Sequence, residues 1–167
     1  MPVVEYTAEK GLVQKSGTSA SLDLQGQLFG HRASIKSVNG ATSLTVADSG
    51  KTILVTASQA GAAYDIALPR LNGTDDEGTC YKFILVQAGN NGAADVTISV
   101  GHADDDFVGH IVATDGVDTA AAADEDITFD QSGGSLPGDT VELFTDGTKW
   151  FVRGQSAAVA GLAFVGA

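Results

Sequence analysis

The stretch from Thr42 to Val100 places the tightest constraint on what this chain can fold into. Short apolar runs recur in it about every ten residues, and a Gly, Asn or Asp turn bounds each run. This spacing predicts several antiparallel strands and leaves no room for long helices. The strands expected here are Lys51–Thr56, Tyr64–Leu68, Cys80–Gln87 and Asp95–Val100. In the last of these runs, apolar and polar residues alternate cleanly. A slip of one residue would bury Asp95, so the register of this strand is well specified.

The run Cys80–Gln87 is the most β-prone part of the chain. Tyr81, Phe83 and Leu85 share one face, and Ile84 and Val86 share the other. Because both faces are apolar, we expect a central strand that is covered on both sides. Cys80 is the one cysteine, so no internal disulfide can form, and we expect it to be a small buried hydrophobic residue.

Turn chemistry extends this pattern along most of the chain. The residues Ala47-Asp48-Ser49-Gly50 predict a hairpin loop between Ser43–Val46 and Lys51–Thr56. Asp146-Gly147 predicts a second hairpin, in which Val141 and Leu143 lie on the face that receives Trp150 and Val152 across the pair. Further strands are expected at Ala33–Val38, Phe107–Ala113 and Asp126–Asp130. The fold class that follows is all-β, an antiparallel β-sandwich or flattened barrel of about nine strands.

The two ends of the chain differ from its middle. Residues 1–32 mix apolar side chains with Gly, Ser, Thr and Gln without a sustained period, which favours an extended N-terminal arm ahead of a β domain at 33–167. A frayed terminus with a first edge strand is the alternative. The apolar C-terminal segment either adds a last strand or contacts a neighbour. The side chains expected to bind a partner are Val3, Val4, Tyr6, Leu12, Val13, Leu22, Leu24, Leu28, Phe29, Leu162, Phe164 and Val165.

Charge argues against several classes of partner. The chain has 9 basic and 21 acidic residues, a net charge of −12, so it repels nucleic-acid backbones and anionic membranes. The N-terminus has no basic segment followed by an apolar run, and we therefore expect no signal peptide. No apolar run is long enough to span a membrane.

No pattern of residues predicts catalysis, a cofactor or a metal. A G-x-S-x-G elbow and a strand–glycine loop–helix unit for phosphates are both missing from the sequence. His102 and His110 bracket the turn Asp104–Asp106, whose carboxylates are possible calcium ligands. The EF-hand spacing is absent, however, and we expect a solvated acidic turn.

Four phrases, in this order, resemble small structural proteins of tailed bacteriophages. They are TVADSGKT (45–52), YDIALP (64–69), YKFILV (81–86) and PGDTVELFTDGTKWFV (137–152). These phage proteins include capsid decoration (cement) proteins and the β domains of tail fibres. The resemblance implies a non-enzymatic virion protein that is made in the host cytoplasm. It also implies a homo-oligomer, a trimer, seated on the capsid surface and bound to the major capsid protein.

A tail-fibre or receptor-binding module that recognises a host surface glycan is the alternative function. Long fibrous, collagen-like or coiled-coil repeats, which would favour a fibre, do not occur in this sequence. A secreted bacterial β domain is a third possibility, and the missing signal peptide disfavours it.

Overall fold

The structure is a computed structural model that describes residues 4–7, 11–14, 33–89, 94–102, 104–120 and 124–166. The chain forms two units, Met1–Arg32 and Ala33–Ala167, each described here by itself. In the first unit, β1 (Val4–Thr7) and β2 (Gly11–Gln14) pair as an antiparallel hairpin. These two strands account for eight of the first 32 residues, and the extended N-terminal arm expected from the sequence stays a prediction.

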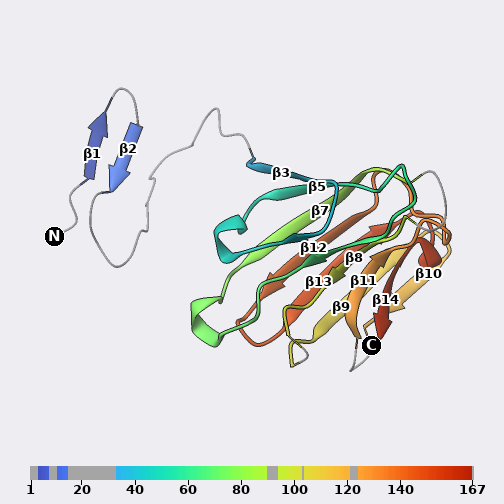
Figure 1. Cartoon of the computed structure of the whole chain (residues 1–167). Coiled ribbons are helices and arrows are strands. Elements are labelled where there is room, and N and C mark those ends of the chain that lie inside the picture. The colour runs from blue at the N-terminus through green and yellow to red at the C-terminus, as the bar shows by residue number, and fades with distance from the viewer. Residues whose placement is uncertain are drawn as a thin grey trace. The chain divides into compact units, whose positions relative to one another are not determined.

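The second unit, called the body below, contains two β-sheets (Figure 1). The seven-stranded sheet has the order β10-β9-β13-β12-β7-β5-β3, and the five-stranded sheet has the order β14-β11-β8-β6-β4. The strands are β3 (Ile35–Val38), β4 (Thr42–Ser43), β5 (Thr52–Thr56), β6 (Tyr64–Ala67), β7 (Cys80–Gln87), β8 (Val96–Ser99), β9 (Phe107–Ala113), β10 (Gly116–Thr119), β11 (Asp124–Phe129), β12 (Thr140–Thr145), β13 (Trp150–Ser156) and β14 (Leu162–Gly166). Among the described residues the only helical elements are three short 3-10 turns, η1 (Val46–Asp48), η2 (Gly73–Asp75) and η3 (Val159–Gly161).

The all-β class expected from the sequence is confirmed, but the purely antiparallel arrangement is wrong. From β3 to β9 the chain changes sheet at every step, so β3, β5 and β7 run parallel in one sheet. In the same way β4, β6 and β8 run parallel in the other. The described part of the body holds twelve strands rather than about nine.

The first expected hairpin does not exist. The strands on either side of Ala47–Gly50 lie in different sheets, and η1 makes the crossing between them. Turn residues can reverse a chain within one sheet, as a hairpin, or carry it across to the facing sheet. Turn chemistry alone therefore could not distinguish a hairpin from a crossing between sheets. The second expected hairpin is confirmed, because β12 and β13 pair with Leu143 opposite Val152.

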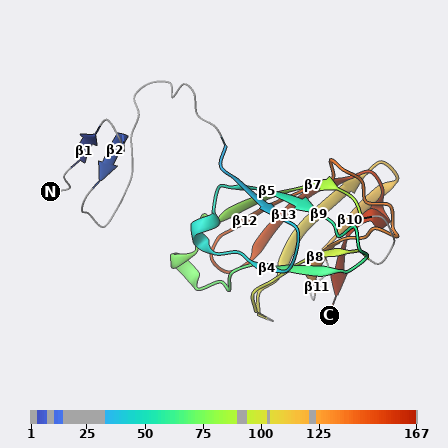
Figure 2. The ribbon, with the colours of Figure 1, turned by 45° about the horizontal axis from the view of Figure 1, so that its top comes forward.

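The two sheets lie one above the other in Figure 2. One hydrophobic core fills the space between them. Its largest fully buried side chains include Trp150, Phe83 and Phe107 from the seven-stranded sheet and Phe129 from the five-stranded sheet. The rings of Tyr81 and Trp150 lie 5.8 Å apart between centroids within it. Because alternate residues of every central strand enter this core, each strand has its register fixed by burial.

Any side chain at Gly147, in the β12–β13 turn, should measurably lower the free energy of unfolding. It has φ +87°, and a Cβ atom there would lie 2.1 Å from the backbone oxygen of Gly73. We expect Gly147→Ala to lower the free energy of unfolding by about 2 kcal/mol, as measured by denaturant titration. Gly138→Ala is the matched control, because Gly138 also has positive φ but has nothing within 4 Å of the added carbon. Equal losses from both variants would show that the contact with Gly73 is unimportant.

Candidate interaction surface

The outward-facing side of the seven-stranded sheet is the candidate interaction surface, and it is called the outer face below. In β7, Tyr81, Phe83 and Leu85 point into the core, so Lys82 and Val86 point outward. The same alternation in β9, β12 and β13 gives each strand one buried and one outward set. The sequence predicted that β7 would be covered on both sides, and this is wrong, because its outward side chains lie exposed or half-buried.

Exposed apolar side chains gather on the outer face. Of the ten large hydrophobic residues that are exposed in the described part of the chain, seven lie there. These seven are Ile35, Val86, Val108, Val112, Val117, Phe144 and Phe151. Single exposed hydrophobic residues are normal in soluble proteins, but a contiguous group of them marks a site of interaction with another molecule.

A row of neighbouring side chains crosses the centre of this face. Cys80 pairs with Phe144, Phe144 pairs with Phe151, and Phe151 pairs with Val108. Gly50 continues the row beyond Cys80, because its backbone N–H donates to the Cys80 carbonyl oxygen over 2.8 Å. The row therefore has small residues at one end and two phenylalanines beside them. Cys80 is half-buried on this outward side, so it is not the core residue that the sequence predicted.

The small end of this row lies in a hollow of about 500 Å³. It is lined by Gly50, Lys51, Thr52, Cys80, Tyr81, Lys82, Glu142, Leu143, Phe144, Phe151, Val152 and Arg153. Most of the exposed area in the hollow is apolar, and the charged side chains of Lys82, Glu142 and Arg153 stand along one side of it. A hollow of this size accepts one or two large side chains from a partner.

A second row next to the first carries charge. In register across the strands it reads Thr52, Lys82, Glu142, Arg153 and His110. The Lys82 ammonium donates to a Glu142 carboxylate oxygen at 2.7 Å, with both side chains about half exposed. An ion pair this exposed contributes little to stability, about 0–1 kcal/mol. Its charges are therefore available to a partner.

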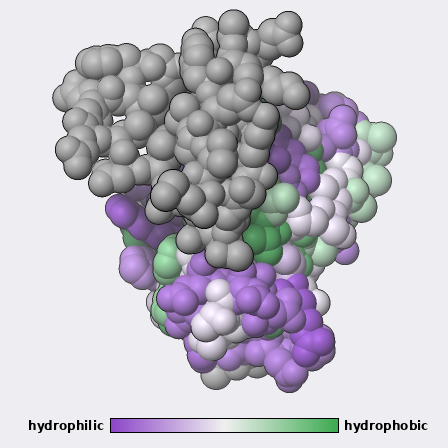
Figure 3. Space-filling model, turned by 90° about the vertical axis from the view of Figure 1, so that its left-hand side faces the viewer, coloured by the Kyte–Doolittle hydropathy of each residue, from purple (hydrophilic) through white to green (hydrophobic). Residues whose placement is uncertain are grey.

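The outer face is much less acidic than the rest of the body. Residues 33–167 hold six basic and eighteen acidic side chains. The strands place only one of the acidic ones, Glu142, on the outer face, together with the basic Lys82 and Arg153. At the end of the body that carries η1 and η2, hydrophilic residues predominate over the lower part of the described surface in Figure 3. The acidity of this chain thus lies mainly away from the outer face.

The outward side of the five-stranded sheet has a different chemistry. Thr97 and Thr128 face each other across β8 and β11 with their hydroxyl oxygens 3.2 Å apart. Asp126 lies on the same side, and partial burial, reinforced by the charges of Asp65 and Glu125, raises the pKa of its carboxyl group. Small hydroxyl groups and carboxylates in this mixture suit contact with water.

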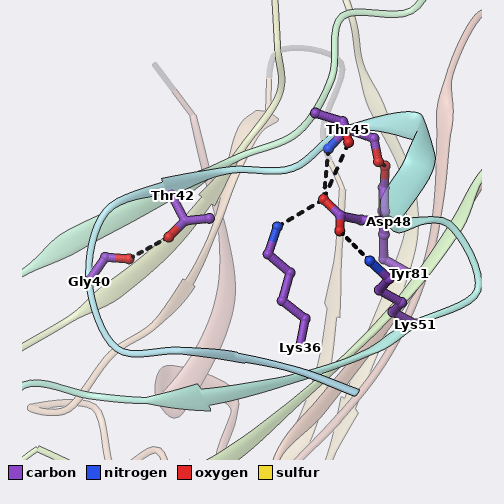
Figure 4. A network of polar contacts seen from close by, with 7 residues as sticks. All are labelled: Lys36, Gly40, Thr42, Thr45, Asp48, Lys51 and Tyr81. Carbon is purple, nitrogen blue, oxygen red and sulfur yellow. Dashed lines mark hydrogen bonds and ion pairs between the residues drawn. The ribbon is translucent and has the colours of Figure 1, made fainter. Parts of the chain in front are cut away.

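A buried carboxylate holds the edge of the seven-stranded sheet together (Figure 4). Asp48, from η1, accepts hydrogen bonds from the Nζ atoms of Lys36 and Lys51, each at 2.8 Å. It also accepts the backbone N–H of Thr45 at 3.2 Å. The bonds from Lys36 and Lys51 hold the pKa of Asp48 well below its usual range. Tyr81 donates to the Thr45 carbonyl oxygen at 2.8 Å, which joins the same crossing to the core.

The predicted partner-binding residues fall into three groups. Val3, Leu22, Leu24, Leu28 and Phe29 lie outside the described residues. Val4 and Tyr6 lie in β1, and Leu12 and Val13 lie in β2. Leu162, Phe164 and Val165 lie in β14, which pairs with β11 as a last strand.

Within β14 the side chains have different surroundings. Leu162 is fully buried in the core of this chain, so it is not free to contact a partner. Phe164 packs against that core with its ring centroid 6.3 Å from that of Phe107. Val165 is exposed, and its contact with a partner stays a prediction. The C-terminal segment is apolar because β14 pairs with β11 and contributes side chains to the core of its own chain.

The acidic turn at 104–106 sends its carboxylates in three directions. Asp104 lies 3.2 Å from Nδ1 of His102, Asp105 accepts the Leu71 N–H at 3.1 Å, and Asp106 pairs with Lys149 at 3.3 Å. Burial raises the pKa of the Asp105 carboxyl group. Within the part of the chain that the structure describes, no group of three or more His, Cys, Asp or Glu side chains is arranged to hold a metal ion.

Comparison of the chain with models of known protein families gave no match, and comparison with curated proteins gave none either. Across the described ranges, no helix has the length and apolar character needed to cross a membrane.

Proposed function

We propose that this protein is a non-enzymatic virion structural protein that decorates and stabilises a bacteriophage capsid by binding the major capsid protein. The observation that carries the proposal is the gathering of seven exposed hydrophobic residues on the outer face. A surface of this kind serves protein association, since large apolar patches on soluble proteins mark interfaces. The resemblance of residues 42–154 to phage structural proteins supplies the context proposed for that association.

The architecture supports a load-carrying role. Twelve strands share one core, and strands distant in sequence hold each other in register, as β13 does with β9. A rigid β body of this kind can bridge neighbouring capsid subunits without changing its own shape. Side chains in residues 1–32 would add contacts to further capsid subunits, and linked contacts of this sort raise the overall affinity.

The number of copies in each virion tests the proposal. A decoration protein repeats over the capsid lattice, so we expect hundreds of copies of this protein per particle when purified virions are analysed on a quantitative gel. The major capsid protein and a tail protein in the same lane provide the two reference intensities. A band equivalent to only a few copies would reject decoration and favour the tail-fibre module that recognises a glycan.

A further inference from the structure

We propose that the outer face of the seven-stranded sheet pairs with the same face of a second copy of this chain. The inference rests on the proposed function in one respect, that the apolar face serves protein association. It assigns this face to a second copy, so the capsid protein would be bound by other surfaces of the body and by residues 1–32. It differs from the trimer that the sequence resemblance implies, because a contact between two identical faces closes with two copies.

The size of the face is sufficient for a specific contact. Strands lie about 4.8 Å apart and rise about 3.3 Å per residue. The seven strands, with central ones of six to eight residues, therefore cover roughly 30 Å by 20 Å. Two such faces together bury about 1,200 Å², which is the lower limit for a stable protein–protein interface.

The distribution of charge favours contact between two copies through the outer face rather than through other surfaces of the body. A body with eighteen acidic and six basic side chains repels its own copies over most of its surface. On the outer face the charged strand residues are Lys82, Glu142 and Arg153, which leave it close to neutral. Two copies therefore meet with the least repulsion when these faces come together.

The apolar row is complementary to itself. Consider a two-fold axis parallel to the strands that passes between β7 and β12. This axis places Cys80 of one copy opposite Phe144 of the other, and Gly50 opposite Phe151. Each pair joins a small residue to a large one, so the two phenylalanines of each copy enter the hollow of about 500 Å³ in its partner. Interdigitation of large with small side chains is how packed sheets fill the space between them.

The same axis makes the charged row complementary. It places Lys82 of one copy opposite Glu142 of the other, and Thr52 opposite Arg153. Opposite charges then meet at the centre of the contact, which fixes the register of the two sheets. The two rows independently favour this axis.

The mass of the full chain in solution tests the pairing. We expect light scattering after size exclusion to give twice the monomer mass of 16.9 kDa at tens of micromolar, with dissociation on dilution. Phe151→Glu places a charge in the hollow of the partner and should weaken the dimer about 30-fold or more. Leu136→Glu is the control, because Leu136 is exposed on a loop and its replacement should leave the dimer intact. Circular dichroism of each variant verifies that it is folded.

A mixing experiment tests the axis itself. Lys82→Glu and Glu142→Lys each remove the ion pair within the chain and create like charges between identical copies. We therefore expect each variant alone to be monomeric and an equimolar mixture of the two to dimerise. A purely structural role for this ion pair cannot be restored by mixing, because neither chain regains it.

Three results would overturn the pairing. A wild-type chain that stays monomeric at 100 µM would mean that residues 1–32 or a capsid protein covers the outer face. A trimer would mean that different surfaces meet. A dimer unaffected by Phe151→Glu would place the contact elsewhere. None of these results bears on the copy number in virions, so failure of the pairing and failure of the proposed function remain distinguishable.

Discussion

Replacing Leu85 with alanine is expected to lower the free energy of unfolding by about 2–5 kcal/mol. Leu85 is 0% exposed, and it extends from β7 into the core shared by the two sheets. The substitution removes apolar surface from the core and leaves a cavity, because sheets held on both sides cannot collapse to fill it. Urea titration followed by tryptophan fluorescence would measure this loss, since Trp150 lies in the same core.

Leu136→Ala is the matched control for this prediction. Leu136 is 52% exposed on the loop before β12, so its loss should change the free energy of unfolding by about 0.5 kcal/mol or less. Similar losses from both variants would mean that the two sheets do not enclose a common core.

Replacing Asp48 with alanine is expected to lower the free energy of unfolding by about 3 kcal/mol at neutral pH. The substitution leaves the ammonium groups of Lys36 and Lys51 without their shared carboxylate, in a site where both are about two-thirds covered. This loss is smaller than the largest losses seen when a fully buried ion pair is broken, because water still reaches both lysines. Asp106→Ala is the control, since the side chains of its pair with Lys149 are more exposed, 36% and 49%, and the pair should contribute about 1 kcal/mol or less.

The contribution of Asp48 also depends on pH. Its pKa in the folded protein lies below the ordinary value of 3.8, so the unfolded chain binds a proton on this group more readily. The stability from Asp48 is therefore complete above about pH 5 and falls as the pH drops toward the folded-state pKa. We expect the difference in unfolding free energy between wild type and Asp48→Ala to shrink between pH 4 and pH 2.5. A difference that stays constant over this interval would contradict the proposed role of the carboxylate.

Local sequence predicted those parts of the fold in which neighbours along the chain pair. The β12–β13 hairpin follows from Asp146-Gly147 and from alternating residues on both sides. The structure has this hairpin and its buried face, although four residues rather than two connect the strands, so that Trp150 lies opposite Thr145. The burial of Ile98 between outward polar residues likewise follows from the alternation in β8. In these places the turn and the period of two determine the outcome together.

The sequence did not predict the path of the chain between the two sheets. The turn residues at 47–50 are compatible with a hairpin, and only the partners of β4 and β5 in separate sheets decide otherwise. Those partners, β6 and β7, are determined by long-range packing, which no local pattern encodes. For the same reason the parallel pairs and the edge position of β3 could not be expected.

The candidate surface was missed because exposed apolar residues in a strand look the same as buried ones. Ile84 and Val86 predict a strand covered on both sides, whereas they face outward in this chain. The sequence does contain one indication of this surface. Phe144 and Phe151 occupy outward positions in a hairpin whose inward positions already supply buried residues to the core. Apolar residues on both sides of a two-faced sheet indicate a surface that another molecule covers.

Electron cryomicroscopy of virions that carry this protein tests the central claim most directly. We predict a density of two packed β-sheets repeated over the outside of the capsid and in contact with the major capsid protein. Density of this shape found only at the tail, or found nowhere on the particle, would contradict capsid decoration.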